Sequence, residues 1–263
     1  EKINAMIGFG GFITVPVGFA CWIKRKPIFI HEQNAVIGSA NKLLSKISKI
    51  NFLGFPVNGL NKSIYSGNPI REEFINNGRN IIDDKNEIRI YITGGSQGSE
   101  YINKHLPKIF KDFSNNIKII HQCGKNNFKE VSNIYSLEGI DAEVSDFYQN
   151  PVEQILWSDF VISRGGALSL SEITSLRRGV VIIPLPTSID NHQVENAKSI
   201  ERIKMGIMHE QKEHINKLQE KIRDIIENKT YLKWKNLENN DHIDSSQIIV
   251  KHLEIYLDKN ETL

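Results

Sequence analysis

The sequence predicts an α/β protein made of two Rossmann-like units, each a parallel sheet with helices, that face one another across a cleft. Short apolar runs alternate with amphipathic stretches along most of the chain, as in repeated strand–helix units. The turn residues at 67–71, Gly-Asn-Pro-Ile-Arg, separate two such series. Glycine clusters follow the strands at the edge where parallel sheets bind ligands.

The first series is short and begins almost at the first residue. We expect strands at 4–7, 27–30 and 51–55, and a helix at 37–47. A buried parallel strand needs a neighbour on each side, so a strand at 4–7 predicts that chain precedes Glu1 and that the first unit lacks its opening strand–helix units. The polar stretch 76–87 is expected to be a linker or an exposed helix end.

The second series is longer and more regular. We expect strands at 88–93, 118–121, 142–144, 160–163 and 180–184, with helices from about 100, at 127–137, at 151–157, up to 176, after 193 and at 243–257. Asn150 before Pro151 suggests a helix N-cap. The predicted domains are 1–69, 70–240 with most of the ligand-binding loops, and a C-terminal helix, 241–263, that packs back on the first domain.

Composition excludes several classes of protein. With 33 Lys+Arg against 31 Asp+Glu the charge is +2, which argues against a nucleic-acid binder. Cys21 and Cys123 show no metal-ligand spacing, so neither a zinc site nor a disulfide framework is expected. No apolar run reaches the roughly 20 residues of a membrane span.

The loop Gly94-Gly95-Ser96-Gln97-Gly98 lies between a predicted strand and a helix. Glycines let a phosphate approach the backbone, and the helix N-terminus offers free N–H groups. A tight turn without a ligand is the alternative, and the two explanations are about equally good for a lone loop. The similar turn with Gly8, Gly10 and Gly11 is better explained as structural.

Four further clusters each have two explanations. Ser169 and Glu172 fit a capping box, which we favour, although Glu172 could also bind ribose hydroxyls. Arg71 could grip a diphosphate or form a hinge salt bridge. The segment 190–193 together with Asn196 could read sugar hydroxyls, or Asp190 could cap the following helix. The segment 31–34 could supply a general base or form a strand–helix junction.

Taken together, these motifs resemble the MurG family, the lipid I N-acetylglucosaminyltransferases of peptidoglycan synthesis. The matching segments, in family order, are GFGGF (8–12), HEQNAVIG (31–38), GNPIR (67–71), GGSQGS (94–99), HQCGK (121–125), SRGGALSLSE (163–172) and DNHQVENA (190–197). The resemblance covers residues 1 to about 200, and the ordered set is specific to the family.

The resemblance implies a GT-B architecture and transfer of N-acetylglucosamine from UDP-N-acetylglucosamine to lipid I, with inversion and without a metal or other cofactor. It implies a phosphate loop that includes Gly94, Gly95 and Gly98, and an acceptor-side glycine loop with Gly8, Gly10 and Gly11. The donor-binding residues that it implies are Asn34, Arg71, Ser96, Tyr148 through its backbone, Ala167, Leu168, Ser169, Leu170, Ser171, Glu172 and Gln193.

The sequence departs from the family at its start. Family members begin with a strand and a GGTGGH-type loop whose histidine is the leading candidate for the catalytic base, and this loop is not in the sequence. Within this chain, Glu32 and His31 remain as candidates to assist. Two alternatives therefore stay open, namely a UDP-sugar-binding remnant with impaired catalysis and another GT-B enzyme such as a UDP-N-acetylglucosamine 2-epimerase.

The lipid substrate of the family implies peripheral contact with the inner leaflet of the bacterial cytoplasmic membrane, from the cytoplasmic side. Residues 22–26, Trp-Ile-Lys-Arg-Lys, combine aromatic, apolar and basic character as an interface would. In this lysine-rich chain, a solvated helix end explains them better.

Overall fold

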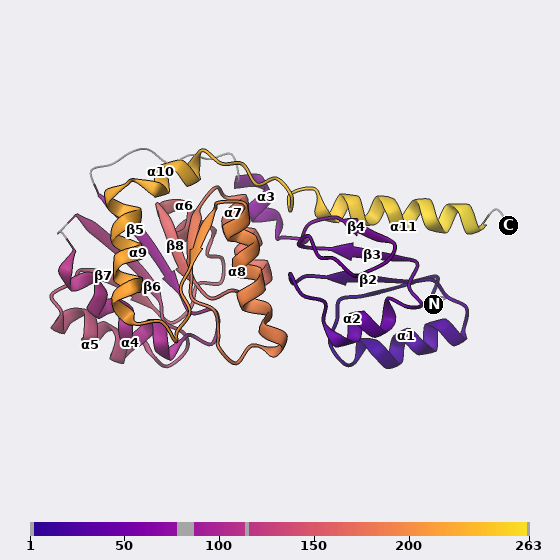
Figure 1. Cartoon of the computed structure of the whole chain (residues 1–263), viewed down its shortest axis with the longest axis horizontal. Coiled ribbons are helices and arrows are strands. Elements are labelled where there is room, and N and C mark those ends of the chain that lie inside the picture. Colours follow the sequence, from indigo (N-terminus) through magenta and orange to yellow (C-terminus); the bar gives the residue numbers. More distant parts are fainter. Residues whose placement is uncertain (1–2, 78–86, 114–115, 262–263) are drawn as a thin grey trace.

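The computed structural model describes residues 3–77, 87–113 and 116–261, and it confirms the predicted fold class of two parallel α/β units (Figure 1). The strands are β1 (Met6–Gly8), β2 (Ile28–Glu32), β3 (Ile50–Leu53), β4 (Ser63–Tyr65), β5 (Ile88–Thr93), β6 (Ile117–Gln122), β7 (Ala142–Ser145), β8 (Phe160–Ser163), β9 (Gly179–Ile182) and β10 (Gly206–Met208). The helices are α1 (Thr14–Ile23), α2 (Ser39–Leu44), α3 (Glu72–Asn77), α4 (Glu100–Ile109), α5 (Phe128–Leu137), α6 (Val152–Trp157), α7 (Ala167–Ser175), α8 (His192–Arg202), α9 (Ile215–Glu227), α10 (Thr230–Lys235) and α11 (Ser245–Glu261), with 3-10 turns η1 (Phe110–Asp112) and η2 (Ile189–Asn191).

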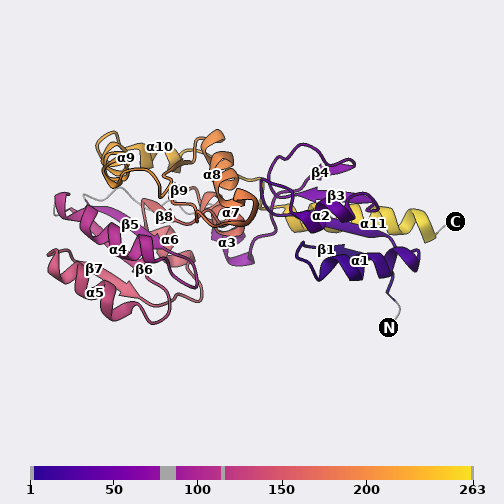
Figure 2. The ribbon, with the colours of Figure 1, turned by 60° about the horizontal axis from the view of Figure 1, so that its bottom comes forward.

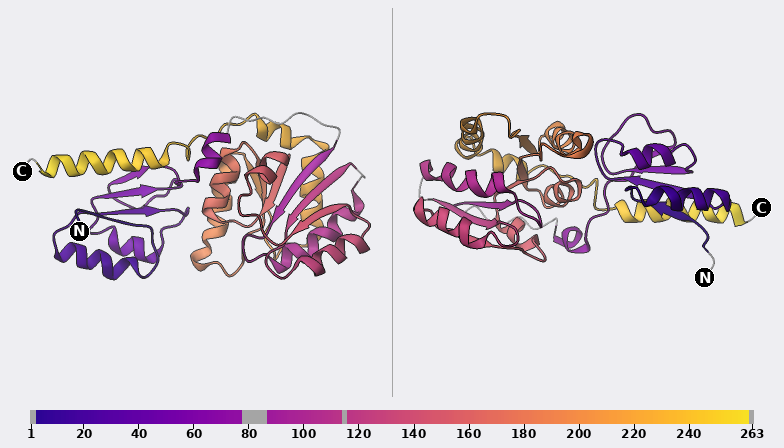
Figure 3. Two further views of the ribbon diagram at one scale, coloured as in Figure 1. Left: turned by 180° about the vertical axis from the view of Figure 1, so that it is seen from behind. Right: turned by 90° about the horizontal axis from the view of Figure 1, so that it is seen from below.

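The first body is a four-stranded parallel sheet in the order β1-β2-β3-β4. Successive side chains of a strand point to opposite faces, so Ile28 and Ile30 pack with Leu44 of α2, while Phe29 and Phe52 pack against Ile249 of α11. Helix α11 therefore covers the face opposite α1 and α2 (Figure 3). Within the described residues β1 pairs only with β2.

The second body is a six-stranded parallel sheet in the order β10-β9-β8-β5-β6-β7. Helices α4, α5, α9 and α10 pack on one face, where Ile90, Ile92 and Phe160 point. Helices α3, α6, α7 and α8 pack on the other face, where Tyr91, Val161 and Val180 point. Figure 2 shows α3, α7 and α8 on the side of this body that faces the first.

The chain passes twice between the bodies, and the two passages are bonded together. The carbonyl oxygen of Gly67 accepts hydrogen bonds from Ser245 Oγ (2.8 Å) and His31 Nε2 (3.0 Å), and the Asn68 N–H donates to His242 Nδ1 (2.9 Å). Gly67 has φ = 75°, and a Cβ there would overlap the carbonyl oxygen of Asp241. The linker and the segment before α11 thus form one packed hinge.

The predicted strands are present, with ends within two residues of the expectation, whereas several predicted helix ends are wrong. The capping box is wrong because α7 begins at Ala167 with Gly166 as N-cap, which places Ser169 and Glu172 inside the helix. Asp190 does not cap α8, whose N-cap is Asn191 without a side-chain bond. Asn150 Oδ1 does accept the Val152 N–H (3.3 Å).

The structure differs from the expectation in one further helix and one strand. The helix expected at 37–47 is shorter, Ser39–Leu44, and β10 was not predicted. Of the expected linker at 76–87, residues 78–86 lie outside the described residues. In the part of the chain that the structure describes, no helix has the combination of length and apolar character that a bilayer crossing requires. The predicted domain boundaries at 69/70 and 240/241 stay predictions.

Candidate functional site

The candidate site lies where the strand order of the second sheet reverses. From β5 the chain continues outward to β6 and β7 on one side, and β8, β9 and β10 extend on the other. Thr93 at the end of β5 pairs in register with Ser163 at the end of β8. Such a switch point leaves a crevice beyond the carboxyl ends of the two strands, and the glycine turns 94–98 and 164–166 follow there.

Two cavities open at this crevice and share four lining residues. The Glu172 cavity, of about 150 Å³, is lined by Arg71, Tyr91, Thr93, Gly95, Ser96, Gln122, Phe147, Tyr148, Gln149, Pro151, Ile155, Ser169, Glu172 and Ile173. The Gln193 cavity, of about 420 Å³, is lined by Thr93, Gly94, Gly95, Ser96, Gln97, Gly98, Ser163, Arg164, Gly166, Ser169, Leu185 and Gln193. An elongated ligand could therefore run from one into the other past Ser96.

The Gln193 cavity has a positive electrostatic character. Helix α4 begins directly after the glycine loop, with Ser99 Oγ accepting the Ile102 N–H (3.2 Å), and α7 begins after Gly166. Both helix N-termini carry partial positive charge. Arg164 adds a cation whose guanidinium donates to the carbonyl oxygens of Ile183 and Pro184, and burial lowers its pKa. No carboxylate of the described residues pairs with Arg164, so this cavity favours an anion.

Gln122 fixes the glycine loop from β6. Its Nε2 donates to Thr93 Oγ1 (3.1 Å) and Gly95 O (3.2 Å), and its Oε1 accepts the Tyr148 N–H (3.0 Å). Thr93 Oγ1 also accepts the Gly95 N–H (3.1 Å). The Tyr148 N–H is thus engaged, which leaves the carbonyl of Tyr148 as its backbone group for a ligand.

Arg71 and Glu172 form a two-point ion pair at the mouth of the Glu172 cavity. Arg71 Nε lies 2.8 Å from Glu172 Oε1, and Nη2 lies 3.2 Å from Oε2. The hydrogen bond to Glu172 raises the pKa of Arg71. The hinge salt bridge considered for Arg71 therefore exists, and its partner is Glu172.

The segment 167–172 does not present every side chain to the cavities. Ser169 lines both cavities and Glu172 lines one. Leu170 is buried in the core, and Ser171 Oγ donates to Ala167 O (2.9 Å) and accepts from Asn68 Nδ2 (3.0 Å). Ala167 is buried and Leu168 is exposed.

A third cavity, the Asn34 cavity of about 620 Å³, opens between the two bodies. It is lined by Phe9, Gly10, Gly11, Phe12, Val15, Glu32, Gln33, Asn34, Val36, Gly38, Ser39, Ala40, Asn41, Leu43, Ile189, Asp190 and His192. Gly8 instead permits close packing, since a Cβ there would meet the side chain of Thr14. Two of the three acceptor-side glycines, Gly10 and Gly11, therefore border this cavity.

Glu32, at the end of β2, holds the Asn34 loop (residues 33–38), and His31 beside it bonds to the hinge. Glu32, 2% exposed, accepts from the Asn34 N–H and Asn34 Nδ2 at Oε1, and from the Gly38 N–H and Asn41 Nδ2 at Oε2. His31 is fully buried, its Nε2–H donates to Gly67 O, and burial lowers its pKa. Four hydrogen bonds occupy the carboxylate, so its environment is that of a structural group.

The structure thus brings Ser96, Glu172 and Gln193 to one crevice, and places Asn34 at the adjoining cavity. Sequence reasoning assigned no role to Thr93, Gln122 or Arg164, although Thr93 and Gln122 end strands and Arg164 directly follows one. Only the strand register, which pairs Thr93 with Gln122 and Ser163, shows that they belong to the site. Within the described ranges, no group of three or more His, Cys, Asp or Glu side chains could hold a metal.

Two sequence profiles of one enzyme family match the chain. The glycosyltransferase family 28 C-terminal domain matches residues 89–251, and the N-terminal domain of the same family matches residues 1–52. A UDP-N-acetylglucosamine–N-acetylmuramyl-(pentapeptide) pyrophosphoryl-undecaprenol N-acetylglucosamine transferase of Psychromonas ingrahamii is 32% identical over 236 residues, which are 88% of this chain and 66% of the relative. The enzyme of that name from Aeromonas hydrophila is 34% identical over 200 residues, 75% of this chain and 55% of the relative. The chain thus spans just under two thirds, or less, of the length of these relatives.

Solved structures agree with this family. The crystal structure of Acinetobacter baumannii MurG superposes with a TM-score of 0.78 at 27% identity, covering 95% of this chain and 74% of that one. A UDP-GlcNAc 2-epimerase from Neisseria meningitidis superposes with a TM-score of 0.63 at 16% identity, covering 95% of this chain and 75% of that one. The epimerase shares the fold alone, so the similarity to it gives no support to an epimerase activity.

Proposed function

We propose that this chain, which belongs to glycosyltransferase family 28, transfers N-acetylglucosamine from UDP-N-acetylglucosamine to lipid I. Lipid I is the N-acetylmuramyl-(pentapeptide) pyrophosphoryl-undecaprenol acceptor named in its curated relatives. The observation that carries the proposal is the pair of joined cavities in which Ser96 lies between Glu172 and Gln193.

In this proposal the donor runs through both cavities. The nucleoside occupies the Glu172 cavity, with the uracil against the Tyr148 backbone and the ribose hydroxyls on the Glu172 carboxylate. The diphosphate lies at Ser96 and the N-terminus of α4, with Arg71 released from Glu172 to contact it. The sugar then reaches Gln193 and, from the first body, Asn34.

The transfer needs groups that stabilise negative charge on the leaving UDP and a proton acceptor for the attacking hydroxyl. The acceptor hydroxyl gives its proton to a general base or to solvent water, its oxygen bonds to the anomeric carbon from the face opposite the diphosphate, and the bond to UDP breaks with its electron pair on the leaving oxygen. Helix N-termini, Arg71 and Arg164 stabilise the charge that develops on UDP. We assign Glu32 to holding the Asn34 loop, because four N–H groups occupy its carboxylate, and His31 to the hinge, because its Nε2–H donates to Gly67 O.

Transfer of radiolabelled N-acetylglucosamine to lipid I in detergent micelles tests the proposal. We expect a lipid-linked disaccharide to form, and Gln193→Ala to reduce its yield at least tenfold. Donor binding without any transfer would instead favour a UDP-sugar-binding remnant, and release of N-acetylmannosamine would favour epimerisation.

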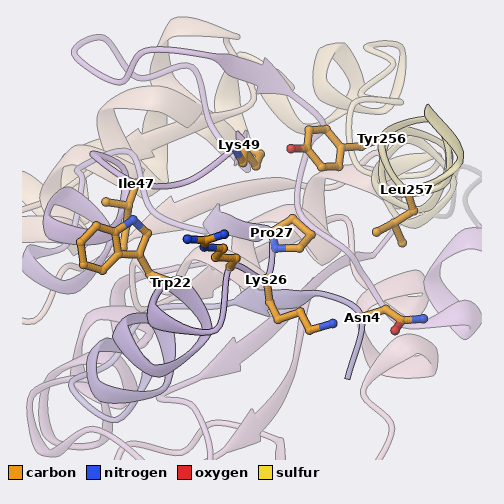
Figure 4. Close-up of a pocket in the computed structure, with 9 residues that line it drawn as sticks. Asn4, Trp22, Lys26, Pro27, Ile47, Lys49, Tyr256 and Leu257 are labelled. Carbon is orange, nitrogen blue, oxygen red and sulfur yellow. The ribbon is translucent and has the colours of Figure 1, made fainter. Parts of the chain in front are cut away.

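We further propose that the first body contacts the inner leaflet of the cytoplasmic membrane, since the acceptor is lipid-linked. Helix α1 exposes apolar side chains, with Ile23 72% and Trp22 55% exposed. Beside them, Arg25, Lys26 and Lys49 line a basic cavity of about 560 Å³ with Trp22 and Tyr256 (Figure 4). Apolar residues rimmed by cations are the composition of an interface with anionic lipid.

Sedimentation with phosphatidylglycerol vesicles tests this contact. Trp22→Ala with Ile23→Ala should release most of the bound protein, whereas Leu137→Ala, which removes a 77% exposed apolar side chain from the second body, should not. Equal binding of both variants would exclude α1 as the contact.

A further inference from the structure

A buried amide of the second body holds the Asn34 loop of the first. Asn196 on α8 is fully buried. Its Nδ2 donates to Asn34 Oδ1 (3.1 Å) and to Gly165 O (3.0 Å), and its Oδ1 accepts the Ala35 N–H (2.7 Å). One side chain therefore joins the Asn34 loop to the turn that follows β8.

The two asparagines differ in what they can offer a ligand. Both amide hydrogens of Asn196 are used, and its remaining lone pair is shielded from solvent. Asn34 is partly exposed at its cavity, and among the described residues its side-chain amide bonds to Glu32 and Asn196 alone, so one N–H and one lone pair remain. Asn34 can touch a ligand, whereas Asn196 can only orient Asn34.

The same face of α8 also fixes the orientation of the Gln193 side chain. Residues three apart on a helix are neighbours, and Gln193 and Asn196 bond to the same residue, Gly165. Gln193 Oε1 accepts the N–H groups of Gly165 (3.1 Å) and Leu185 (2.9 Å), which leaves its Nε2 for the Gln193 cavity. The N-terminal half of α8 thus fixes the two groups, Gln193 and Asn34, that would read the sugar from opposite bodies.

We propose that Asn196 is a positioning residue for sugar recognition, which aims Asn34 at the donor sugar when the two bodies are together. This inference rests on the proposed function. The uridine diphosphate lies against the second body alone, so its binding is independent of this link. The sugar is contacted from both bodies, so its recognition depends on the link.

Calorimetric titration with UDP and with UDP-N-acetylglucosamine separates the two contributions. Asn196→Ala and Asn34→Ala should each weaken UDP-N-acetylglucosamine about tenfold, and UDP less than twofold. The double variant should bind UDP-N-acetylglucosamine about as weakly as either single variant, because both substitutions remove the same contact. Asn239→Ala is the matched control, a buried amide of the second body that donates to Thr174 Oγ1 (2.9 Å), and it should change neither affinity.

Other outcomes overturn the inference in distinguishable ways. Equal losses for UDP and UDP-N-acetylglucosamine would make Asn196 a structural residue of the second body, and additive losses would make the two asparagines independent. Should Asn196→Ala not fold, Asn196→Asp serves instead, because it keeps the acceptor for the Ala35 N–H and loses the two donors. It should also weaken UDP-N-acetylglucosamine about tenfold and UDP less than twofold. A wild-type chain that binds UDP but not the sugar nucleotide contradicts the inference, while one that binds neither contradicts the proposed function itself.

Discussion

Arg71 and Glu172 form an ion pair across the mouth of the Glu172 cavity, in which Arg71 Nε and Nη2 donate to the two carboxylate oxygens at 2.8 and 3.2 Å. Both are proposed to bind the donor, Arg71 at the diphosphate and Glu172 at the ribose. Donor binding must therefore exchange this pair for two new ones, and each partner holds the other near the site until the donor arrives. Arg71 is 45% exposed at its side chain, so the pair itself adds little to stability.

Replacing Glu172 tests the ribose contact. Glu172→Ala should weaken UDP and UDP-N-acetylglucosamine at least tenfold, because hydrogen bonds to a charged group contribute about 1.5–3 kcal/mol. At donor concentrations above the dissociation constant, the stabilisation given by the donor would then fall by about 1.4 kcal/mol or more, which shows as a smaller thermal shift. Glu238→Ala, which breaks the exposed pair with Arg177 in the same body, is the control and should keep the full shift. An undiminished shift in Glu172→Ala would remove Glu172 from the site.

Replacing Arg71 tests the diphosphate contact. Arg71→Ala should weaken UDP about tenfold and leave the affinity for uridine unchanged, because uridine has no phosphate for the guanidinium to bind. Competition against a fluorescent UDP derivative measures both affinities. A similar loss for uridine would mean that Arg71 acts only by orienting Glu172.

Replacing Gly67 tests how tightly the hinge is packed. Gly67→Ala should lower the free energy of unfolding by about 3 kcal/mol or more, since it adds a clash with Asp241 to a left-handed backbone. Gly139 has φ = 70°, and among the described residues none beyond its chain neighbours lies within 4 Å of an added Cβ, so Gly139→Ala isolates the backbone cost of about 1 kcal/mol. Urea denaturation compares the two, and equal losses would show that the hinge tolerates a side chain.

Buried histidines predict a loss of stability in acid. Burial lowers the pKa of His242 to about 4 and that of His121 to about 3, below the ordinary value of 6.5. The unfolded chain therefore binds more protons between pH 6.5 and pH 4, so the free energy of unfolding falls as the pH falls through this window and is level above it. His242→Asn offers an oxygen in place of Nδ1 to the Asn68 N–H, and it should flatten part of the slope measured by urea denaturation. An unchanged slope would mean that His242 titrates normally.

The strands and glycine loops could be predicted from sequence because apolar runs and turn residues are local patterns. The cap at Ser169 could not be resolved, because the same spacing fits a helix that starts three residues earlier, at Ala167 with Gly166 as its N-cap. The structural roles of Gln122, Asn196 and Asn68 could not be predicted from the sequence either. Each acts on residues far along the chain, such as Asn196 on Asn34, and such contacts follow from strand order and from the approach of the two bodies.

A crystal structure with UDP-N-acetylglucosamine bound tests the central claim most directly. We predict density for uridine in the Glu172 cavity and for the diphosphate at Ser96, with the sugar between Gln193 and Asn34 and the Arg71–Glu172 pair opened. A donor bound elsewhere on the molecule, or cavities left empty at saturating donor with that pair intact, would contradict the account.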